Sequence, residues 1–433
     1  MTYGTIEVRP TGSDTNGGGF DVDLTGTDYS QQDAAQATGT NMVVDSAPNN
    51  YLVSPDGHTC VAADVGNYIY TDDAGTIKWY RIIAINGTTK WQVAGTMTAD
   101  ATGITWSMGG ALASPGAAGK CVTDIAITHT IFIKAATYTL TTATFGTGGP
   151  FRSNSSLVFV RSYVTARTDV VDEDSAKAII DAGAITNVIL WHQDYANMSR
   201  FWGLKADGQG NAGVDGFKVD YGGGKAVHCE AVDCVVGFTF LRVSRCVATG
   251  CSSIGFSVPG QAIHCIADTC GTGFYIPVIM EFCLAVDCTV RGIYLDSVND
   301  ATHCTVDGCD EGIRALTYCS VESCIITNST TQGIKTAALG AIENCASDNA
   351  GTTADDDSNA WPIGDDYRID ITSDPYVDRA GGDYSINDTW LATLTVRTGI
   401  PGHGSQPVIG AVQPVAGGAA GMLRRSSQRG GYE

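Results

Sequence analysis

The chain has 433 residues, 53 glycines, 16% charged residues and a formal net charge of −21 at pH 7. Anionic nucleic acids and anionic membrane surfaces repel such a chain on average, which argues against general binding to either partner. Hydrophobic residues make up 43% of the sequence, enough to fill a large core, yet they form no run long enough for a transmembrane helix.

The N-terminal part, residues 1–110, has the pattern of a β-rich region. Its first four residues lack the basic and then apolar segment of a secretory signal, so we expect no export by that route. Short strands separated by turns are expected at 67–70, 79–83 and 91–93. We predict that this region caps the body that follows, because the open end of a solenoid exposes unpaired backbone groups.

Residues 110–215 have the pattern of wide, irregular first coils of that body. Apolar segments predict buried strands at 131–133, 157–160 and 188–190. The segment Asp174–Ala182 suggests a short helix, which is the only helix that we expect in the chain.

A sequence repeat runs from residue 216 to residue 349. Its first mark is a glycine followed by Phe or Ile, in steps of 18 to 21 residues, at Gly216, Gly237, Gly255, Gly273, Gly292, Gly312 and Gly333. Its second mark is Cys-x4-Cys, at Cys229/Cys234, Cys246/Cys251, Cys265/Cys270, Cys283/Cys288, Cys304/Cys309 and Cys319/Cys324. A degenerate seventh copy has Cys345 alone.

This repeat predicts a right-handed parallel β-helix over residues 111–349, with regular coils at 216–349. Each repeat of about 20 residues holds three short strands, and in Cys-x-Ala the small side chains alternate into a narrow interior. The glycine is expected to allow a tight corner, and the Phe or Ile after it to fill the core. Leucine-rich repeats are the rival solenoid, but their Leu-x-x-Leu-x-Leu pattern is absent.

The cysteines have three interpretations. Metal binding requires converging thiolates, which Cys-x4-Cys without histidine partners fits poorly. Disulfides between neighbouring coils remain an alternative. We predict columns of free, buried thiols that act as small hydrophobic side chains.

The repeat ends after Asn349, and residues 350–415 are predicted to form a C-terminal capping segment. A polar break at 355–357 precedes a stretch, 367–412, that should fold back or cap the last coil. Residues 416–433 form a Gly-rich basic tail, which either docks on an acidic neighbour or stays an unstructured terminus. Its basic residues are Arg424, Arg425 and Arg429.

The coil pattern resembles the pectate-lyase-like superfamily of right-handed parallel β-helices. Three segments resemble the C-terminal closing pattern of bacterial and viral members: Asp374–Asp378, Gly382–Tyr384 and Ile409–Ala411. Residues 391–399 depart from that pattern. Three others resemble β-helix proteins encoded in bacteriophage and prophage structural regions: Asp64–Asn67, Trp79–Ile82 and Trp106–Leu112. The likeness covers most of residues 60–415.

The superfamily implies glycoside hydrolases and polysaccharide lyases, so both chemistries must be considered. The resemblance implies that hydrolases of this fold carry motifs similar to Asn-Thr-Asp, Asp-Asp, Gly-His-Gly and Arg-Ile-Lys. Their acidic residues flank one glycosidic bond. This chain has Gly402-His403-Gly404 beyond the repeats, but it has neither Asn-Thr-Asp nor Arg-Ile-Lys. We interpret its Gly-His-Gly as a loop.

Lyases of this fold imply calcium-binding acids and a basic residue. An acidic column precedes the second cysteine and alternates between two turn positions: Asp233, Asp268, Asp287, Asp307 and Glu322. Calcium needs six to eight oxygens around one point, and aspartate also favours turns by itself, so weak Ca²⁺ binding stays an alternative. Arg291 beside Asp296 and Asp300 is a second candidate cluster.

Two further sets of residues have both a structural and a functional interpretation. Either a metal ladder or surface positions on a sheet face would explain His228, His264 and His303, and we favour the surface. Either a core stack or a sugar platform would explain Phe217, Phe238, Phe256 and Phe274, and we favour the core. We therefore predict no catalytic, cofactor-binding or metal-binding residue.

The leading functional hypothesis is a non-catalytic structural virion protein of a bacteriophage: a head decoration, a tail-associated protein or a fibre or spike. Such a protein assembles in the host cytoplasm with other virion proteins, as a homo-oligomer for which a trimer is one candidate. The first alternative is a polysaccharide lyase or depolymerase that acts on a host surface glycan. The second is a bacterial surface adhesin.

Overall fold

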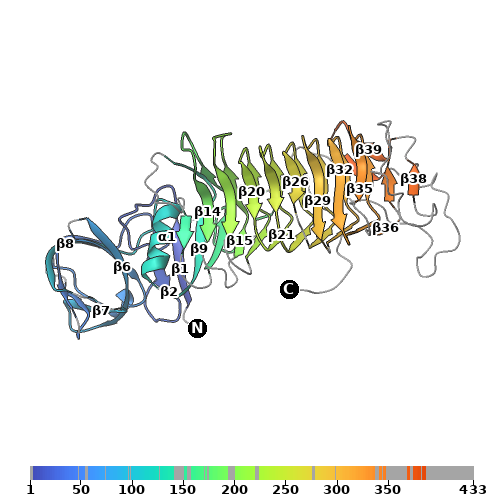
Figure 1. The fold of residues 1–433 in the computed structure, drawn as a ribbon. Helices are drawn as coiled ribbons and strands as arrows, with labels where there is room; N and C mark the ends of the chain where they lie inside the picture. The colour runs from blue at the N-terminus through green and yellow to red at the C-terminus, as the bar shows by residue number, and fades with distance from the viewer. Residues whose placement is uncertain are drawn as a thin grey trace. The chain divides into compact units, whose positions relative to one another are not determined.

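The computed structural model confirms an all-β parallel solenoid (Figure 1). Two compact units divide the chain: residues 1–171, 176–205 and 219–224 belong to unit 1, and residues 172–175, 206–218 and 225–433 to unit 2. The structure describes residues 3–46, 48–53, 57–73, 75–95, 97, 99–125, 127–140, 151–153, 158–169, 171–172, 175–193, 200–219, 224–275, 278–297, 299–336, 341–343, 345–347, 368–370, 374–381 and 383–386.

Unit 1 contains a closed antiparallel barrel, which is the blue ring of strands in Figure 1. Its strands, in the order β3-β4-β7-β6-β5-β8, are β3 (Ala37–Asp45), β4 (Tyr51–Val53), β7 (Lys90–Val93), β6 (Thr76–Ile85), β5 (Tyr68–Asp73) and β8 (Ala101–Met108). A short 3₁₀ turn, Ala62–Asp64, precedes β5. The apolar face of each strand points inward, so that Met42, Leu52, Trp91 and Trp106 fill the core. Closure leaves the barrel without an unpaired edge.

The first strand of the chain lies outside this barrel. Strand β1 (Tyr3–Val8) pairs in parallel with β9 (Thr128–Lys134), and β2 (Gly19–Asp21) pairs with β1 in antiparallel sense. Residues 3–8 therefore belong to the first coil, and the division at residue 110 stays a prediction. The first coils also hold β10 (Thr137–Thr139), β11 (Phe151–Ser153), β12 (Val158–Tyr163), β13 (Ala178–Asp181), β14 (Ile189–Gln193), β15 (Arg200–Trp202) and β16 (Leu204–Asp207).

The helix predicted at 174–182 is wrong. Residues Ala178–Asp181 form strand β13, because alternate side chains of this apolar segment point inward and its backbone pairs with β10. The helix that does form, α1 (Pro115–Asp124), consists largely of small residues. Ser114 caps it by accepting a hydrogen bond from the Ala117 amide, and its burial compensates for its weak intrinsic helix propensity.

Unit 2 is a stack of three-stranded coils (Figure 1). Sheet 1 of this unit comprises β18 (Lys225–Val227), β21 (Arg242–Ser244), β24 (Gln261–Ile263), β27 (Ile279–Glu281), β30 (Asp300–Thr302), β33 (Ser320–Glu322) and β36 (Ala341–Glu343). Sheet 2 comprises β19 (Glu230–Val232), β22 (Val247–Thr249), β25 (Ile266–Asp268), β28 (Leu284–Val286), β31 (Thr305–Asp307), β34 (Ile325–Thr327), β37 (Cys345–Ser347) and β38 (Arg368–Asp370). Sheet 3 comprises β17 (Asp215–Val219), β20 (Val236–Thr239), β23 (Ile254–Ser257), β26 (Thr272–Tyr275), β29 (Arg291–Ser297), β32 (Glu311–Thr317) and β35 (Gln332–Thr336).

Equivalent residues of successive coils form ladders inside unit 2. The rings of Phe217, Phe238, Phe256 and Phe274 stack with centroids 4.8–4.9 Å apart, which is the spacing between hydrogen-bonded strands. All four rings are fully buried. The prediction of a core phenylalanine stack is confirmed.

The corners of the coils are not made by the repeated glycines. Two columns of mostly non-glycine residues adopt a left-handed backbone with φ of 49–66°: His228, Arg245, His264, Phe282, His303 and Ser323, and then Asp233, Gly250, Thr269, Asp287, Gly308 and Asn328. The glycine of the Gly-Phe motif lies inside sheet 3 instead, where space is the constraint. A Cβ on Gly255 would lie 2.8 Å from the Gly273 carbonyl oxygen and 3.1 Å from Cys270 Sγ.

Two cysteine columns line the interior, but the sixth predicted pair is out of register. The Cys304 amide lies 3.4 Å from Cys324 Sγ, so Cys324 stacks in the first column and not as the second cysteine of a pair. Cys319 precedes β33 and lies outside both columns. Its five-residue spacing from Cys324 is therefore a coincidence and not a copy of the repeat. All fifteen cysteines are buried thiols without disulfides, so the prediction of buried thiol columns in the repeat is confirmed.

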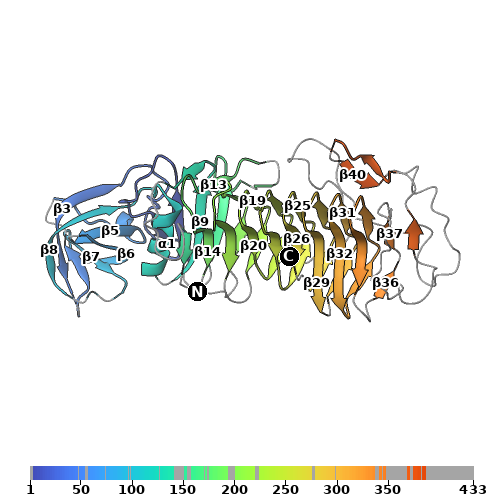
Figure 2. The ribbon, with the colours of Figure 1, turned by 45° about the horizontal axis from the view of Figure 1, so that its top comes forward.

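Residues 374–381 and 383–386 fold back on sheet 2. Strands β39 (Tyr376–Asp378) and β40 (Asp383–Ile386) form an antiparallel hairpin, drawn in red in Figure 2. Tyr376 and Tyr384 pack on the outer side chains of β28 and β34. This cover explains why every residue of β28, β31 and β34 is buried, whereas β19, β22 and β25 bury only their middle residue.

Candidate functional site

The acidic residues of the repeat do not converge on one point. Asp233 and Asp287 occupy left-handed corners, whereas Asp268 and Asp307 end strands of sheet 2, which confirms the two alternating positions. Glu322 ends a strand of sheet 1 and belongs to neither set. Among the residues that the structure describes, no three His, Cys, Asp or Glu side chains are grouped to hold a metal ion. Weak Ca²⁺ binding stays a hypothesis.

Asp307 is the most strongly bonded of these acids. Its side chain is 2% exposed, and Arg379 Nε lies 2.6 Å from Oδ2. Thr327 Oγ1 and Asn328 Nδ2 donate to Oδ1 at 2.7 and 2.8 Å. These donors occupy both carboxylate oxygens, so Asp307 anchors the hairpin rather than offering an open ligand.

The second acidic candidate, the cluster around Arg291, is not assembled. Arg291 Nε lies 2.5 Å from Glu311 Oε2, and its guanidinium stacks 5.3 Å from the ring centroid of Tyr294. Asp296 lies farther along the same strand, and Asp300 lies on sheet 1. Sequence proximity misled here, because the coil turns between these residues.

The three histidines lie at coil corners and not on a sheet face, so their predicted position is wrong. His264 and His303 sandwich Phe282, with ring centroids 5.1 Å apart on each side, while His228 is buried. Burial lowers the pKa of His264, helped by the charge of Arg245, and burial also lowers the pKa of His303. The left-handed corner backbone, which histidine tolerates better than most residues, accounts for their spacing.

Gly402-His403-Gly404 and the basic tail with Arg424, Arg425 and Arg429 lie outside the described residues. Their predicted roles stay predictions.

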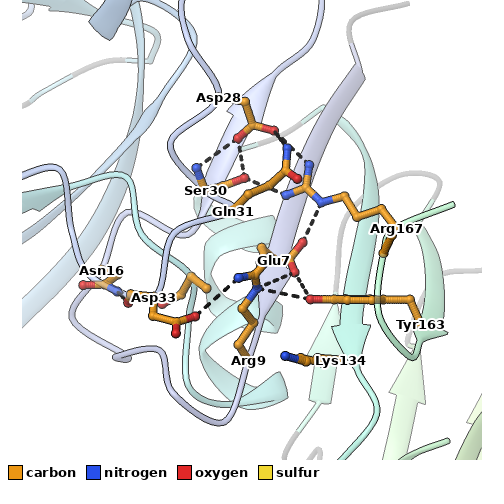
Figure 3. Close-up of polar contacts among 12 residues, drawn as sticks. Glu7, Arg9, Asn16, Asp28, Ser30, Gln31, Asp33, Lys134, Tyr163 and Arg167 are labelled. Carbon is orange, nitrogen blue, oxygen red and sulfur yellow. Dashed lines mark hydrogen bonds and ion pairs between the residues drawn. The ribbon is translucent and has the colours of Figure 1, made fainter. Parts of the chain in front are cut away.

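Sequence reasoning missed a buried carboxylate in the first coil of unit 1. Glu7 lies on β1 between Ile6 and Val8, which point into the core, so its side chain points to the outer face. The loop that carries Asp28, Ser30 and Asp33 runs beside this face (Figure 3). Glu7 is completely buried there.

Two arginines and a tyrosine saturate the Glu7 carboxylate (Figure 3). Arg9 Nε lies 2.9 Å from Oε1, and Arg167 Nε lies 2.6 Å from Oε2. The Tyr163 hydroxyl donates to Oε1. Burial opposes the charge of Arg9, but its hydrogen bond and ion pair with Glu7 outweigh burial and raise the pKa of Arg9.

Arg167 connects this group, which we call the Glu7 network, to the loop. Its Nη1 lies 2.8 Å from Asp28 Oδ2, and its Nη2 lies 2.7 Å from Ser30 Oγ. Burial works against the Asp28 carboxylate, but the Ser30 hydroxyl, Arg167 and the Ser30 amide together lower its pKa. Because both carboxylate oxygens of Glu7 are occupied, the arrangement holds the loop in place.

A single charged residue inside an apolar strand segment was the available signal for this network. Glu7 occupies an outward position between the inward-pointing Ile6 and Val8, so the alternating pattern of a strand is kept. Its partners Tyr163 and Arg167 follow 156 and 160 residues later, a separation that no local pattern can join.

The comparisons with known proteins give no identity. No family model matches the chain, and no curated protein matches it. In the described part of the chain, no helix has both the length and the apolar surface to cross a bilayer.

Proposed function

We propose that this protein is a non-catalytic structural component of a bacteriophage particle. The observation that carries the proposal is the ordered interior of unit 2, where cysteine, alanine and phenylalanine ladders run from coil to coil and Ile293, Ile313 and Ile334 continue the phenylalanine stack. Each coil contacts its neighbours through backbone hydrogen bonds and a packed core. Such a body resists deformation, which suits a part in a large assembly.

The ionic contacts of three acidic residues support a structural role. Glu7, Asp307 and Glu311 each bind an arginine, at distances of 2.5–2.9 Å. A general acid or base must reach a substrate, and these carboxylates are held by their own chain. The assignment to a phage particle depends on the resemblance of Asp64–Asn67, Trp79–Ile82 and Trp106–Leu112, which now fall within or beside the barrel.

Protein mass spectrometry of gradient-purified particles from lysed host cells tests this proposal. We expect peptides of the chain at a constant ratio to the major capsid protein across the particle peak. Peptides that stay in the lysate and never sediment with particles would contradict the proposal. Antibody labelling of the same particles then distinguishes a head from a tail position.

A second candidate function, binding or cleavage of a host surface glycan, is favoured by one face of unit 1. Arg161 stacks over Phe132 at 5.7 Å and Arg200 over Phe159 at 5.5 Å, each measured to the ring centroid. Neither arginine forms an ion pair with a described residue. Trp202, which is 36% exposed, lies on β15 opposite Arg161 of β12. Aromatic rings and guanidinium groups together are suited to binding acidic sugars.

A glycan panel separates this candidate from the first. Purified protein is incubated with acidic polysaccharides, with and without Ca²⁺, and the release of unsaturated ends and direct binding are measured. Binding that is lost in Arg200→Ala but kept in Lys120→Ala, an exposed position on α1, would support the glycan candidate. The absence of both binding and cleavage across the panel would reject it.

A further inference from the structure

The outer face of sheet 1 in unit 2 has an ordered distribution of charge. The strand register places its outward residues in two columns: Lys225, Arg242, Gln261, Ile279, Asp300 and Ser320, and beside them Val227, Ser244, Ile263, Glu281, Thr302 and Glu322. We call this the sheet 1 face. Each step along a column moves one coil along the solenoid.

One end of the sheet 1 face is basic. Lys225 and Arg242 are directly opposed on β18 and β21, and both are exposed. Arg245, also exposed, lies at the corner that follows β21. Neither Arg242 nor Arg245 forms an ion pair with another described residue. Arg242 and Arg245 thus carry positive charge without an ion-pair partner in the described part of a chain whose net charge is −21.

The other end of the face is acidic. Asp300 is exposed at the start of β30, and Glu322 is half-buried on β33. Glu281, which is also half-buried, lies nearer the middle of the face on β27. These three acids also have no ion-pair partner among the described residues. Burial lowers the pKa of His303 at the adjacent corner, while the charges of Glu322 and Glu281 act on it in the opposite direction.

The middle of the face is apolar. Ile279 is 40% exposed and Val278, just before it, is 43% exposed. Ile263 is half-buried on the preceding coil. Large aliphatic side chains at the centre of a face, with opposite charges at its two ends, are the composition of an interface core with a polar rim.

We propose that the sheet 1 face binds the same face of a second copy of this chain, with the two solenoid axes antiparallel. A two-fold axis parallel to the strands, between β24 and β27, places Arg242 of each copy opposite Asp300 of the other. The same operation brings Ile279 of both copies to the centre and Lys225 toward the coil that carries Glu322. Such an isologous contact is closed, because each copy contributes the same patch.

Charge decides both the partner and the orientation. A parallel arrangement would oppose Arg242 to Arg242 and Asp300 to Asp300, and like charges disfavour it. Because the chain is strongly acidic, two copies repel each other unless their few unpaired arginines meet acids. The contact therefore strengthens at low ionic strength and weakens with added salt.

Sedimentation velocity of the full chain, over a range of concentration and salt, tests the proposal. We expect a monomer–dimer equilibrium that shifts toward monomer as salt rises. Arg242→Glu and Asp300→Arg, each alone, should weaken the dimer by at least about tenfold, because every substitution alters two symmetric contacts. The double variant R242E/D300R exchanges the charges and should restore the dimer.

The controls separate this inference from folding and from the proposed function. Lys120→Glu changes the net charge as much as Arg242→Glu does and should leave the equilibrium unchanged. A monomer under all conditions, an oligomer insensitive to Arg242→Glu, or a double variant as weak as the single ones would overturn the proposal. Particle incorporation is measured separately, so failure of the dimer and failure of the particle assignment remain distinguishable.

Discussion

His129 is a completely buried imidazole in unit 1. It lies on β9, and its Nε2 is 3.1 Å from the hydroxyl of Tyr68 on barrel strand β5. Burial lowers the pKa of His129 from 6.5 to about 4, and the charge of Arg81 adds to this effect. A hydrogen bond with the Ile127 backbone acts in the opposite direction. The native state thus holds a neutral histidine that the unfolded chain protonates near pH 6.5.

We predict that this histidine destabilises unit 1 as the pH falls from about 6.5 to about 4. In that window the unfolded state binds one proton more than the native state, so the free energy of unfolding rises with pH and is lost on acidification. The full effect is about 3 kcal/mol at one residue. Urea unfolding followed by tryptophan fluorescence should show a shallower pH dependence in His129→Gln, and equal slopes in both proteins would contradict the assignment.

Glu7 offers a second test at the residue scale. Glu7→Ala leaves the guanidinium groups of Arg9 and Arg167 without their shared carboxylate, and we expect a loss of about 3–5 kcal/mol. Asp33→Ala is the matched control, because Asp33 is 51% exposed and meets Arg9 only at 3.4 Å, a contact worth about 0–1 kcal/mol. Chemical denaturation measures both variants, and similar losses would show that the network contributes little.

At the element scale, the coil corners explain part of the repeat. His, Asp, Asn and Gly tolerate the left-handed backbone better than other residues, and they fill eight of the twelve corner positions. At ten of these corners the amide still bonds to the next coil, as from His264 to the Glu281 carbonyl oxygen at 3.0 Å. The residue before each cysteine was therefore a structural signal, not a site.

The C-terminal hairpin is an element whose attachment can be measured. Arg379→Ala removes the partner of Asp307, a carboxylate with an exposed fraction of 2%, and should cost about 1–3 kcal/mol. Hydrogen exchange should then increase in β39 and β40 and at the outer residues of β28 and β34, which the hairpin covers. Val377→Ala, at a residue 56% exposed on the same hairpin, should leave exchange unchanged. Unaltered exchange in Arg379→Ala would show that the ion pair does not hold the hairpin.

At the scale of the whole molecule, the fifteen cysteines test the packing of both units. Burial, helped by Asp64, raises the pKa of Cys60 to about 12, and burial with nearby aspartates raises the pKa of Cys234 to about 12. Reaction with a thiol reagent should be slow in the native protein, because the thiolate is the nucleophile. After denaturation without reductant, all fifteen should react. A count that rises further after reduction would reveal disulfides.

The solenoid of unit 2 could be predicted because its cause is local and repeated. Cys-x-Ala and Gly-Phe recur at nearly constant steps, and any fold that stacks equal segments must align them. The same reasoning did not predict α1, because its Pro-Gly-Ala-Ala-Gly start is a weak helix signal. It also predicted a helix where β13 forms a strand of a coil. Burial against neighbours decided both elements.

The sequence by itself determined the β-helix, its interior phenylalanine stack and the buried state of the cysteines, because alternation and period are properties of consecutive residues. Only the tertiary structure decided which charges meet. Glu7 meets Arg167, and Asp307 meets Arg379, across 160 and 72 residues of chain. It also decided the role of the repeated glycines, since the contact that excludes a Cβ comes from the neighbouring coil. Distances between coils are set by packing and backbone pairing, which a linear pattern does not contain.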